Sequence, residues 1–359
     1  MAAIESRLKK QLAKNDMSRG RLILPLPNED KLRRDTTSVI QYSVEQNCRA
    51  CLDAFLAQRD KLEPYMNVQE ELNKSLVFAI KNNNMNMFDY LIQQQHVDIN
   101  YQCRSCYSRS PLLMALSFKR YNFFFKLIDL GADPHVIDID GRNAFHNLFV
   151  FYKKHEDVSD NNLATRTATI KEIIDTLAAK KVSLQHKDNK GLSPLIVAGG
   201  TDDAEVFYHL KSKGVTIQLD NKVEVVSLLN HILFCHPDQL HPPDPAFFEK
   251  VVADYQIPLT KELFDTPDLL KLHTITNIVY GNTNRKLFDL LMKLKVNVNV
   301  TSDGFDTPIN LAILNRSYYM CDGLLSAGVK LDEHTKNYRK RFSDNPQLLK
   351  KFKLVCASN

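Results

Sequence analysis

Glycine is scarce in this chain, at 11 of 359 residues. This scarcity argues against phosphate-cradling loops and flexible linkers, because both depend on the conformational freedom of glycine. Long apolar runs are also missing. Residues 1–20 alternate apolar and charged side chains, without the apolar core of about 7–15 residues that a secretory signal contains. No stretch approaches the roughly 18 apolar residues that a membrane-spanning helix needs. We therefore expect no membrane span and a cytoplasmic location, with the nucleus as the alternative.

The common catalytic motifs are absent as well. The sequence contains no G-x-S-x-G, no H-E-x-x-H and no G-x-x-x-x-G-K-[ST], which present a nucleophile, a zinc site and a phosphate loop respectively. Cys and His residues are scattered along the chain rather than grouped as a nucleophile and its base. The sequence therefore predicts a protein that is not an enzyme, with no catalytic residues and no cofactor.

Charge and cysteine content narrow the class further. Lys and Arg exceed Asp and Glu by five, so the basic bias is mild. Nothing in this balance calls for a nucleic-acid partner, which requires basic residues gathered on one face. An odd number of cysteines, seven, in a chain expected inside the cell predicts reduced thiols rather than a disulfide framework.

Three segments of the chain share one pattern. Each begins with a Ser/Thr-Pro pair, which can start a helix with a hydroxyl at the N-cap and proline in the first turn. Apolar residues at helical spacing follow, then a polar break, a second apolar helix and a glycine that can end it. The pairs are Ser110-Pro111, Ser193-Pro194 and Thr307-Pro308, and the closing glycines are Gly131, Gly214 and Gly328.

This pattern resembles the ankyrin repeat, a unit of about 33 residues with a β-turn, two helices and a T-P-L-H-x-A signature. Weaker copies fit the same register. One runs from Asp138 to His146, and its Asn143 falls 33 residues after Ser110. Others start near Ser38, Lys74, Val226 and Thr274. The resemblance implies an all-α solenoid of about eight helix-turn-helix units with short β-turn fingers, over residues 35–335.

Two departures from the period predict inserted loops. Asn143 and Ser193 are 50 residues apart, and Val226 and Thr274 are 48 apart. The excess falls in polar stretches near residues 152–165 and 235–245, and the second of these contains several prolines. Outside the repeats, residues 1–34 are expected to be a tail or capping helix, and residues 336–359 a basic capping helix or tail. For the basic C-terminal tract, a solvated helix face is favoured over a nuclear-import or anion-binding role.

Metal binding is considered at two places and disfavoured at both. Cys48-x-x-Cys51 and Cys103-x-x-Cys106 could supply four thiolates to zinc. The ankyrin register instead places the first pair at the start of a second helix and the second pair in a finger. The run Cys235-His236-Pro237-Asp238, with His241 beyond it, lies in a proline-rich stretch that more simply forms a stiff connection. We expect no metal site.

Ankyrin proteins usually bind partners with their finger tips and first helices, so the resemblance implies partner-binding positions. Because the core is not expected to hold these turn side chains, they are free for contact. The finger positions are Tyr107, Arg109, Ile139, Asp140, Arg142, Asn189, Lys190 and Leu192, and the helix-end positions are Phe118 and Phe151. Core packing is an equal alternative for the two Phe residues.

The predicted function is a protein-binding adaptor or scaffold whose partner and oligomeric state the sequence does not specify. One alternative is an effector or inhibitor from a pathogen or symbiont that docks on host proteins. Another is an enzyme whose site is built by the two inserted loops.

Overall fold

A computed structural model gives the fold of the chain. The residues it describes are 39–57, 59–62, 67–94, 97–151, 163–233, 244–282, 284–332, 335–336, 338, 341 and 344–358. They form helices joined by turns, with two isolated β-bridges and no longer strand within these ranges, so the predicted all-α class is confirmed. None of the described helices is both long and apolar enough to span a membrane.

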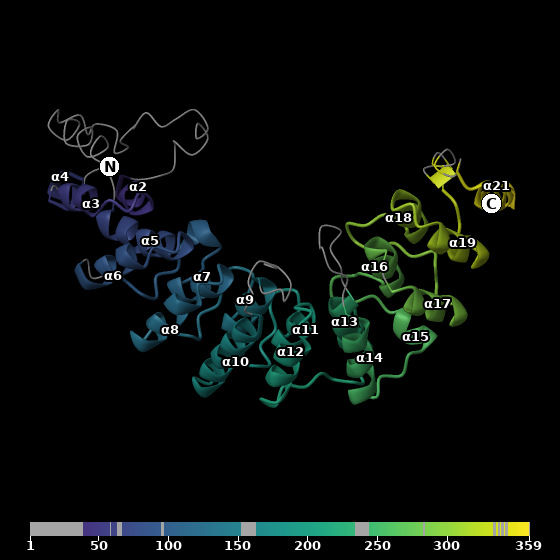
Figure 1. The fold of residues 1–359 in the computed structure, drawn as a ribbon, viewed down its shortest axis with the longest axis horizontal. Coiled ribbons are helices and arrows are strands. Elements are labelled where there is room, and N and C mark those ends of the chain that lie inside the picture. Colours follow the sequence, from purple (N-terminus) through teal and green to yellow (C-terminus); the bar gives the residue numbers. More distant parts are fainter. Residues whose placement is uncertain are drawn as a thin grey trace. The chain divides into compact units, whose positions relative to one another are not determined.

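The chain divides into two compact units. The first consists of residues 1–151 and 179–183, and the second of residues 152–178 and 184–359. The helices of the first unit (Figure 1) are α2 (Val39–Glu45), α3 (Arg49–Leu56), α4 (Arg59–Leu62), α5 (Val68–Lys81), α6 (Met85–Gln94), the 3-10 turn η2 (Arg104–Cys106), α7 (Pro111–Ser117), α8 (Tyr121–Asp129) and α9 (Ala144–Phe151).

The second unit contains all but the end of α10, and the remaining helices. They are α10 (Leu163–Ala179), α11 (Pro194–Gly199), α12 (Ala204–Lys211), α13 (Lys222–Leu233), α14 (Pro245–Asp254), α15 (Lys261–Phe264), α16 (Thr274–Gly281), α17 (Arg285–Lys293), α18 (Pro308–Leu314), α19 (Tyr318–Ser326) and α21 (Pro346–Ser358).

The helices pack as successive pairs. In the first unit α5 packs on α6 and α7 on α8, while α2, α5, α7 and α9 pack in a row. In the second unit α11 packs on α12, α13 on α14, α16 on α17 and α18 on α19. There α11, α13, α16 and α18 form the corresponding row, which Figure 1 shows beside the row of their partners. Each pair therefore buries one face against its own partner and another against the next pair.

Helix starts follow the Ser-Pro pattern. Ser110 Oγ accepts from the backbone N–H of Leu113 at 3.3 Å, and Ser193 Oγ accepts from that of Ile196 at 3.5 Å. Proline occupies the first turn of both helices. Because a hydroxyl N-cap satisfies an amide that the helix leaves unpaired, these sequences fix where α7 and α11 begin.

Aromatic side chains join neighbouring second helices. Phe88 of α6 meets Phe123 of α8 edge to face, with ring centroids 5.2 Å apart. Phe207 of α12 and Phe247 of α14 do the same at 5.3 Å. All four are buried, and such edge-to-face contacts add to the stabilisation from burial. The apolar core is therefore continuous from pair to pair within each unit.

Side-chain hydrogen bonds also tie each pair to the next. Asn100 Oδ1 accepts from the backbone N–H of Asp133 at 2.8 Å, 33 residues on. Asn299 Oδ1 accepts from that of Lys330 at 2.6 Å, 31 residues on. These bonds satisfy backbone N–H groups that lie just after the second helices and have no partner within a helix. The residue separation reflects the regular spacing of the pairs.

The C-terminal helix α21 closes the second unit. It packs on α19, with Leu348 and Phe352 buried and Lys351 Nζ donating to Asp322 O at 3.0 Å. Within the segment 336–359, for which a basic capping helix or tail is predicted, residues 346–358 thus form a helix with a buried apolar face. The N-terminal segment 1–34 and most of both predicted insertions, at 152–162 and 234–243, lie outside the described residues.

Candidate functional site

Three turns that precede first helices have one design, and we call these turns fingers. In the finger Asp138–Arg142, Asp138 N donates to Arg142 O and Gly141 N donates to Asp138 O, both at 3.0 Å. The buried Asp138 Oδ1 accepts from the backbone N–H groups of Asp140 and Arg142 at 3.0 and 2.9 Å. The carboxylate thus fixes the turn from inside, as an Asx turn does.

The same bonds recur in two fingers of the second unit. Asp188 Oδ1 accepts from the N–H groups of Lys190 and Leu192, both at 2.9 Å. Asp268 Oδ1 accepts from those of Leu270 and Leu272 at 2.8 and 2.9 Å. All three carboxylates are buried, and each belongs to the fifth residue before the N-cap position of the next helix.

This design directs the middle side chains of each finger outward. Ile139 is 62% exposed, Leu270 is 37% exposed, and Asn189 and Lys190 are also exposed. The fourth position has a left-handed backbone, at φ 74° in Gly141. The backbone is therefore held rigidly while the outward side chains are available for contact.

A fourth finger, Cys103–Arg109, is built differently. Cys103 N donates to Arg109 O at 3.1 Å, and the turn η2 and two left-handed residues, Tyr107 and Ser108, form its tip. Tyr107 is 62% exposed, and its carbonyl accepts from Ile139 N of the next finger at 3.0 Å. The two exposed side chains thus stand on directly bonded fingers. Together with Ile137, which is also exposed, they form what we call the finger surface.

Arg109 supports the finger surface from beneath, and the prediction that its side chain is free is wrong. It is buried, its Nε lies 3.5 Å from Asp138 Oδ2, and its guanidinium lies 5.0 Å from the centroid of the Tyr107 ring. Asn147 Nδ2 donates to the same carboxylate oxygen at 3.2 Å. A buried carboxylate needs such partners, and it draws Arg109 inward from 29 residues away.

Leu192 was also expected to be free, and that prediction is wrong too. It is buried because it directly precedes the N-cap Ser193. An apolar residue at that position commonly packs against the helix it introduces. Arg142 and Asp140 are paired, with Arg142 Nη1 donating to Asp140 Oδ2 at 2.8 Å, so part of their charge is already neutralised.

The predicted helix-end positions differ in what the structure describes. Phe118 is half-buried, and the Lys81 ammonium lies 5.8 Å from its ring centroid and 5.9 Å from that of Phe78. It therefore takes part in a cation–π cluster between successive pairs. The side chain of Phe151 lies outside the described residues.

A pocket of about 560 Å³ opens between fingers of the second unit. Lys190, Lys271 and Asp303 are charged residues of its lining, and Leu270 and Phe305 contribute apolar surface. Lys271 Nζ lies 3.5 Å from Asp303 Oδ2, with both side chains largely exposed. The pocket thus combines apolar walls with lysines, which suits a ligand that carries apolar and acidic groups.

Two residues of α13 line the same pocket. Asn230 Nδ2 donates to Asp268 Oδ2 at 2.9 Å and to Leu272 O at 3.1 Å. His231 Nδ1 lies 2.8 Å from Ser227 O, and because a carbonyl only accepts, this ring nitrogen carries the proton. Sequence reasoning missed this pocket because Lys271 stands where the other two carboxylate fingers have glycine. Asp268 is the fifth residue before the N-cap of α16, as in the other two carboxylate fingers, and this spacing could have revealed the finger that lines the pocket.

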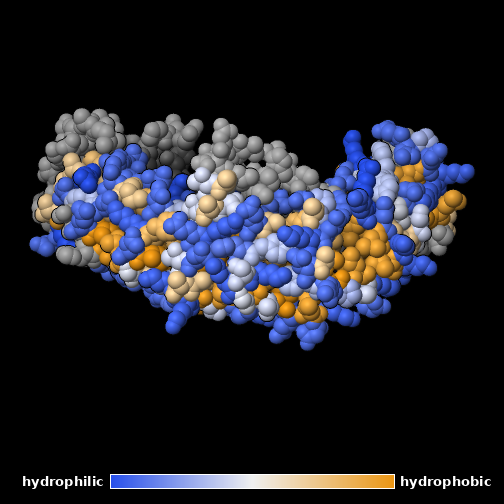
Figure 2. Space-filling model, turned by 60° about the horizontal axis from the view of Figure 1, so that its bottom comes forward, coloured by the Kyte–Doolittle hydropathy of each residue, from blue (hydrophilic) through white to orange (hydrophobic). Residues whose placement is uncertain are grey.

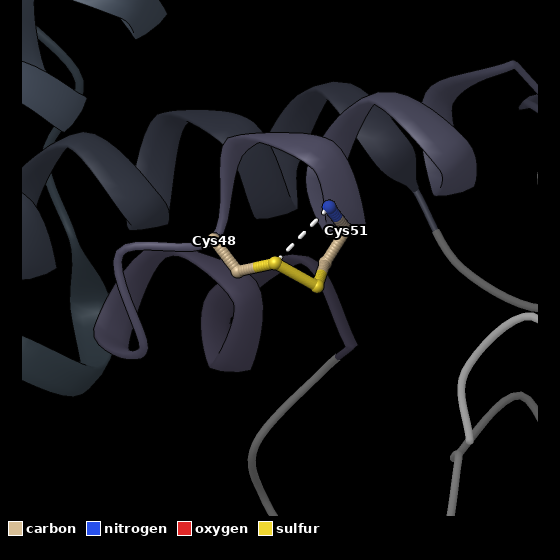
Figure 3. The surroundings of a disulfide bond; sticks show 2 residues. All are labelled: Cys48 and Cys51. Atoms are coloured by element: carbon tan, nitrogen blue, oxygen red, sulfur yellow. Dashed lines mark hydrogen bonds between the residues drawn. A yellow bond between two sulfur atoms is a disulfide. The ribbon is translucent and has the colours of Figure 1, made fainter. Parts of the chain in front are cut away.

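The cysteine predictions need one correction. Cys48 and Cys51 form a disulfide with Cα atoms 5.3 Å apart, shown in Figure 3. Cys48 is the N-cap of α3, and its Sγ accepts from Cys51 N at 3.2 Å, so the first helical turn brings the two sulfurs together. The expectation of reduced thiols rests on an intracellular location. The spacing of the cysteines in the sequence does not reveal whether they are oxidised. Cys103 and Cys106 are free, and no group of three or more metal-ligating side chains occurs among the described residues.

Outside these features, the view in Figure 2 shows a face covered mainly by hydrophilic residues, with hydrophobic residues in separate patches. The sequence matches no protein-family model, and no curated protein matches it as a relative.

Proposed function

We propose that this chain is a non-enzymatic adaptor or scaffold of the ankyrin-repeat type, which binds a protein partner through its fingers. Several observations support the repeat architecture. Helices pack in successive pairs, a carboxylate-fixed turn precedes several first helices, and side-chain bonds join residues 33 and 31 apart. The Ser/Thr-Pro starts of α7, α11 and α18 agree with it.

The finger surface carries the proposal of partner binding. Tyr107, Ile137 and Ile139 are large apolar residues with 62%, 45% and 62% of their surface exposed. Exposed aromatic and aliphatic side chains of this kind act as anchors in protein interfaces. Here the backbone beneath them is fixed by the Tyr107–Ile139 hydrogen bond and by buried Asp138. Little backbone conformational entropy is therefore lost on binding, which favours affinity.

The decisive experiment is a binding measurement on tip variants. Affinity capture and mass spectrometry first identify a partner, and its Kd is then measured for the full chain. Tyr107→Ala with Ile139→Ala should raise Kd at least about tenfold, because truncating interface anchors typically loses 2 kcal/mol or more. The free energy of unfolding should change by no more than about 1 kcal/mol, because both side chains are mostly exposed and Tyr107 loses only its contact with the Arg109 guanidinium.

A matched control is Leu130→Ala with Leu354→Ala. Both leucines are exposed apolar residues away from the fingers, after α8 and in α21, at 43% and 63% exposure. This variant should bind like the parent chain. Equal weakening by both double variants, or no weakening by the tip variant, would reject the finger surface as the binding site. A separate Lys190→Glu variant tests whether the second-unit pocket contacts the partner as well.

A further inference from the structure

The finger Cys103–Arg109 carries two thiols close to the exposed Tyr107. Cys103 is buried at the base of the finger, and Cys106 is partly exposed in η2. Neither belongs to a disulfide. The buried sulfur and the accessible sulfur thus occupy one turn.

The turn brings the two cysteines within bonding range. Cys106 N donates to Cys103 O at 2.9 Å, and a turn closed in this way keeps its first and fourth Cα atoms within about 7 Å. A disulfide requires a Cα separation of about 4.4–6.8 Å. The Cys48–Cys51 pair has the same spacing in sequence, and there a disulfide is formed at a Cα separation of 5.3 Å.

Polar contacts prepare these thiols for reaction. Ser105 Oγ lies 3.2 Å from Cys103 Sγ and 4.0 Å from Cys106 Sγ. A hydrogen bond with Cys106 lowers the pKa of Cys103 to about 6, and the same bond raises the pKa of Cys106. The hydrogen bond therefore favours loss of one proton from the pair and lets the two sulfurs share the remaining one. Cys321, by contrast, is completely buried, so a disulfide in solution does not reach its thiol.

We propose that Cys103 and Cys106 are a redox-active dithiol, which low-molecular-weight disulfides oxidise to an intramolecular disulfide at the tip of this finger. Cys106 Sγ attacks one sulfur of the small disulfide while Cys103 takes its proton, and one small thiolate leaves. This leaving thiolate then takes the proton from Cys103. The Cys103 thiolate attacks Cys106 Sγ and expels the second small thiolate, which takes a proton from solvent. Two electrons pass from the cysteine pair to the small disulfide, which becomes two small thiols.

Oxidation also bears on partner binding, a step that rests on the proposed function. Tyr107 directly follows Cys106, and its carbonyl is bonded to Ile139. A Cys103–Cys106 disulfide ties the residue before Tyr107 to the base of the finger. The finger surface then has a different conformation in its reduced and oxidised forms, and partner affinity differs between them.

The test exposes the full chain to glutathione disulfide and reduced glutathione at graded ratios. Remaining thiols are alkylated, and peptides are mapped by mass spectrometry without reduction. We expect a peptide linked between Cys103 and Cys106 at oxidising ratios, which reducing ratios reverse. Cys321 should stay alkylatable only after unfolding. Cys356, a partly exposed thiol in α21, should form a mixed disulfide with glutathione disulfide at least about tenfold more slowly than Cys106.

Single variants separate the two steps. In Cys103→Ser, Cys106 should accumulate a stable glutathione adduct because the resolving thiol is gone. In Cys106→Ser, the buried Cys103 should acquire none. A Cys103–Cys106 pair that stays fully alkylatable at every ratio overturns the proposal. A disulfide that forms without changing the partner Kd overturns only its link to binding, whereas the Tyr107 and Ile139 variants judge the proposed function itself.

Discussion

The fingers Cys103–Arg109 and Asp138–Arg142 are neighbours in the first unit and hold their tips by different means. In the second finger a buried carboxylate receives two backbone N–H groups of its own turn. The first finger has no such carboxylate and relies on a backbone bridge, the turn η2 and two left-handed residues. Its Arg109 instead reaches to Asp138. One finger is thus fixed by a carboxylate of its own, while the other is tied to its neighbour through Arg109.

Among the variants that test this contrast, Asp138→Ala should have the largest effect on stability. The substitution removes the acceptor of two turn amides and breaks the buried ion pair between Asp138 and Arg109. In urea denaturation, we expect the free energy of unfolding to fall by about 3–5 kcal/mol, which is the usual result of breaking a buried ion pair. Asp140→Ala is the control, because that side chain is 44% exposed, and it should lose less than about 1 kcal/mol. Similar losses in both variants would mean that the carboxylate does not organise the turn.

Arg109→Ala should have a smaller effect. Asp138 keeps its bonds from the turn amides and from Asn147, so its charge remains largely satisfied. We expect a loss of about 2 kcal/mol from the missing ion pair and the packing beneath Tyr107. Amide exchange should rise in the Cys103–Arg109 finger and stay unchanged in the Asp188 finger of the second unit. Faster exchange in both would contradict the local role assigned to Arg109.

Lys271→Gly is expected to stabilise the protein. Lys271 has φ 57° where the other two carboxylate fingers have Gly141 and Gly191, and a left-handed backbone strains a residue with a side chain by about 1 kcal/mol. Its exposed pair with Asp303 contributes little. The net gain should be about 0.5 kcal/mol, seen as a higher midpoint in urea denaturation. The reverse change, Gly141→Lys, should lower that midpoint.

Reducing the Cys48–Cys51 disulfide is also expected to have a modest effect. The bond closes a loop of few residues, so it restricts the unfolded chain little and should contribute no more than about 2 kcal/mol. Cys48 Sγ can still accept from Cys51 N as an N-cap after reduction. Cys51→Ala should match the reduced protein in thermal denaturation. A collapse of α2 and α3 by circular dichroism would show that the bond holds the first pair together.

Local sequence predicted helix starts and turn positions better than it predicted exposure. Ser110 and Ser193 cap helices as expected because capping depends on residues within one turn. The burial of Arg109 was missed because its partner Asp138 lies 29 residues away. The second-unit pocket was missed because its lining residues are far apart in the sequence, from Lys190 to Phe305. Which side chain a turn leaves outside is decided by tertiary contacts that spacing alone does not encode.

The bond from Ile139 N to Tyr107 O makes one amide a reporter of finger separation. Ile139 presents its side chain to solvent, so its N–H would exchange quickly if only its own finger protected it. Its protection comes from the carbonyl of the neighbouring finger. The deuterium uptake of this single N–H therefore measures how often the two fingers part, whether through thermal motion, oxidation or a partner wedged between them.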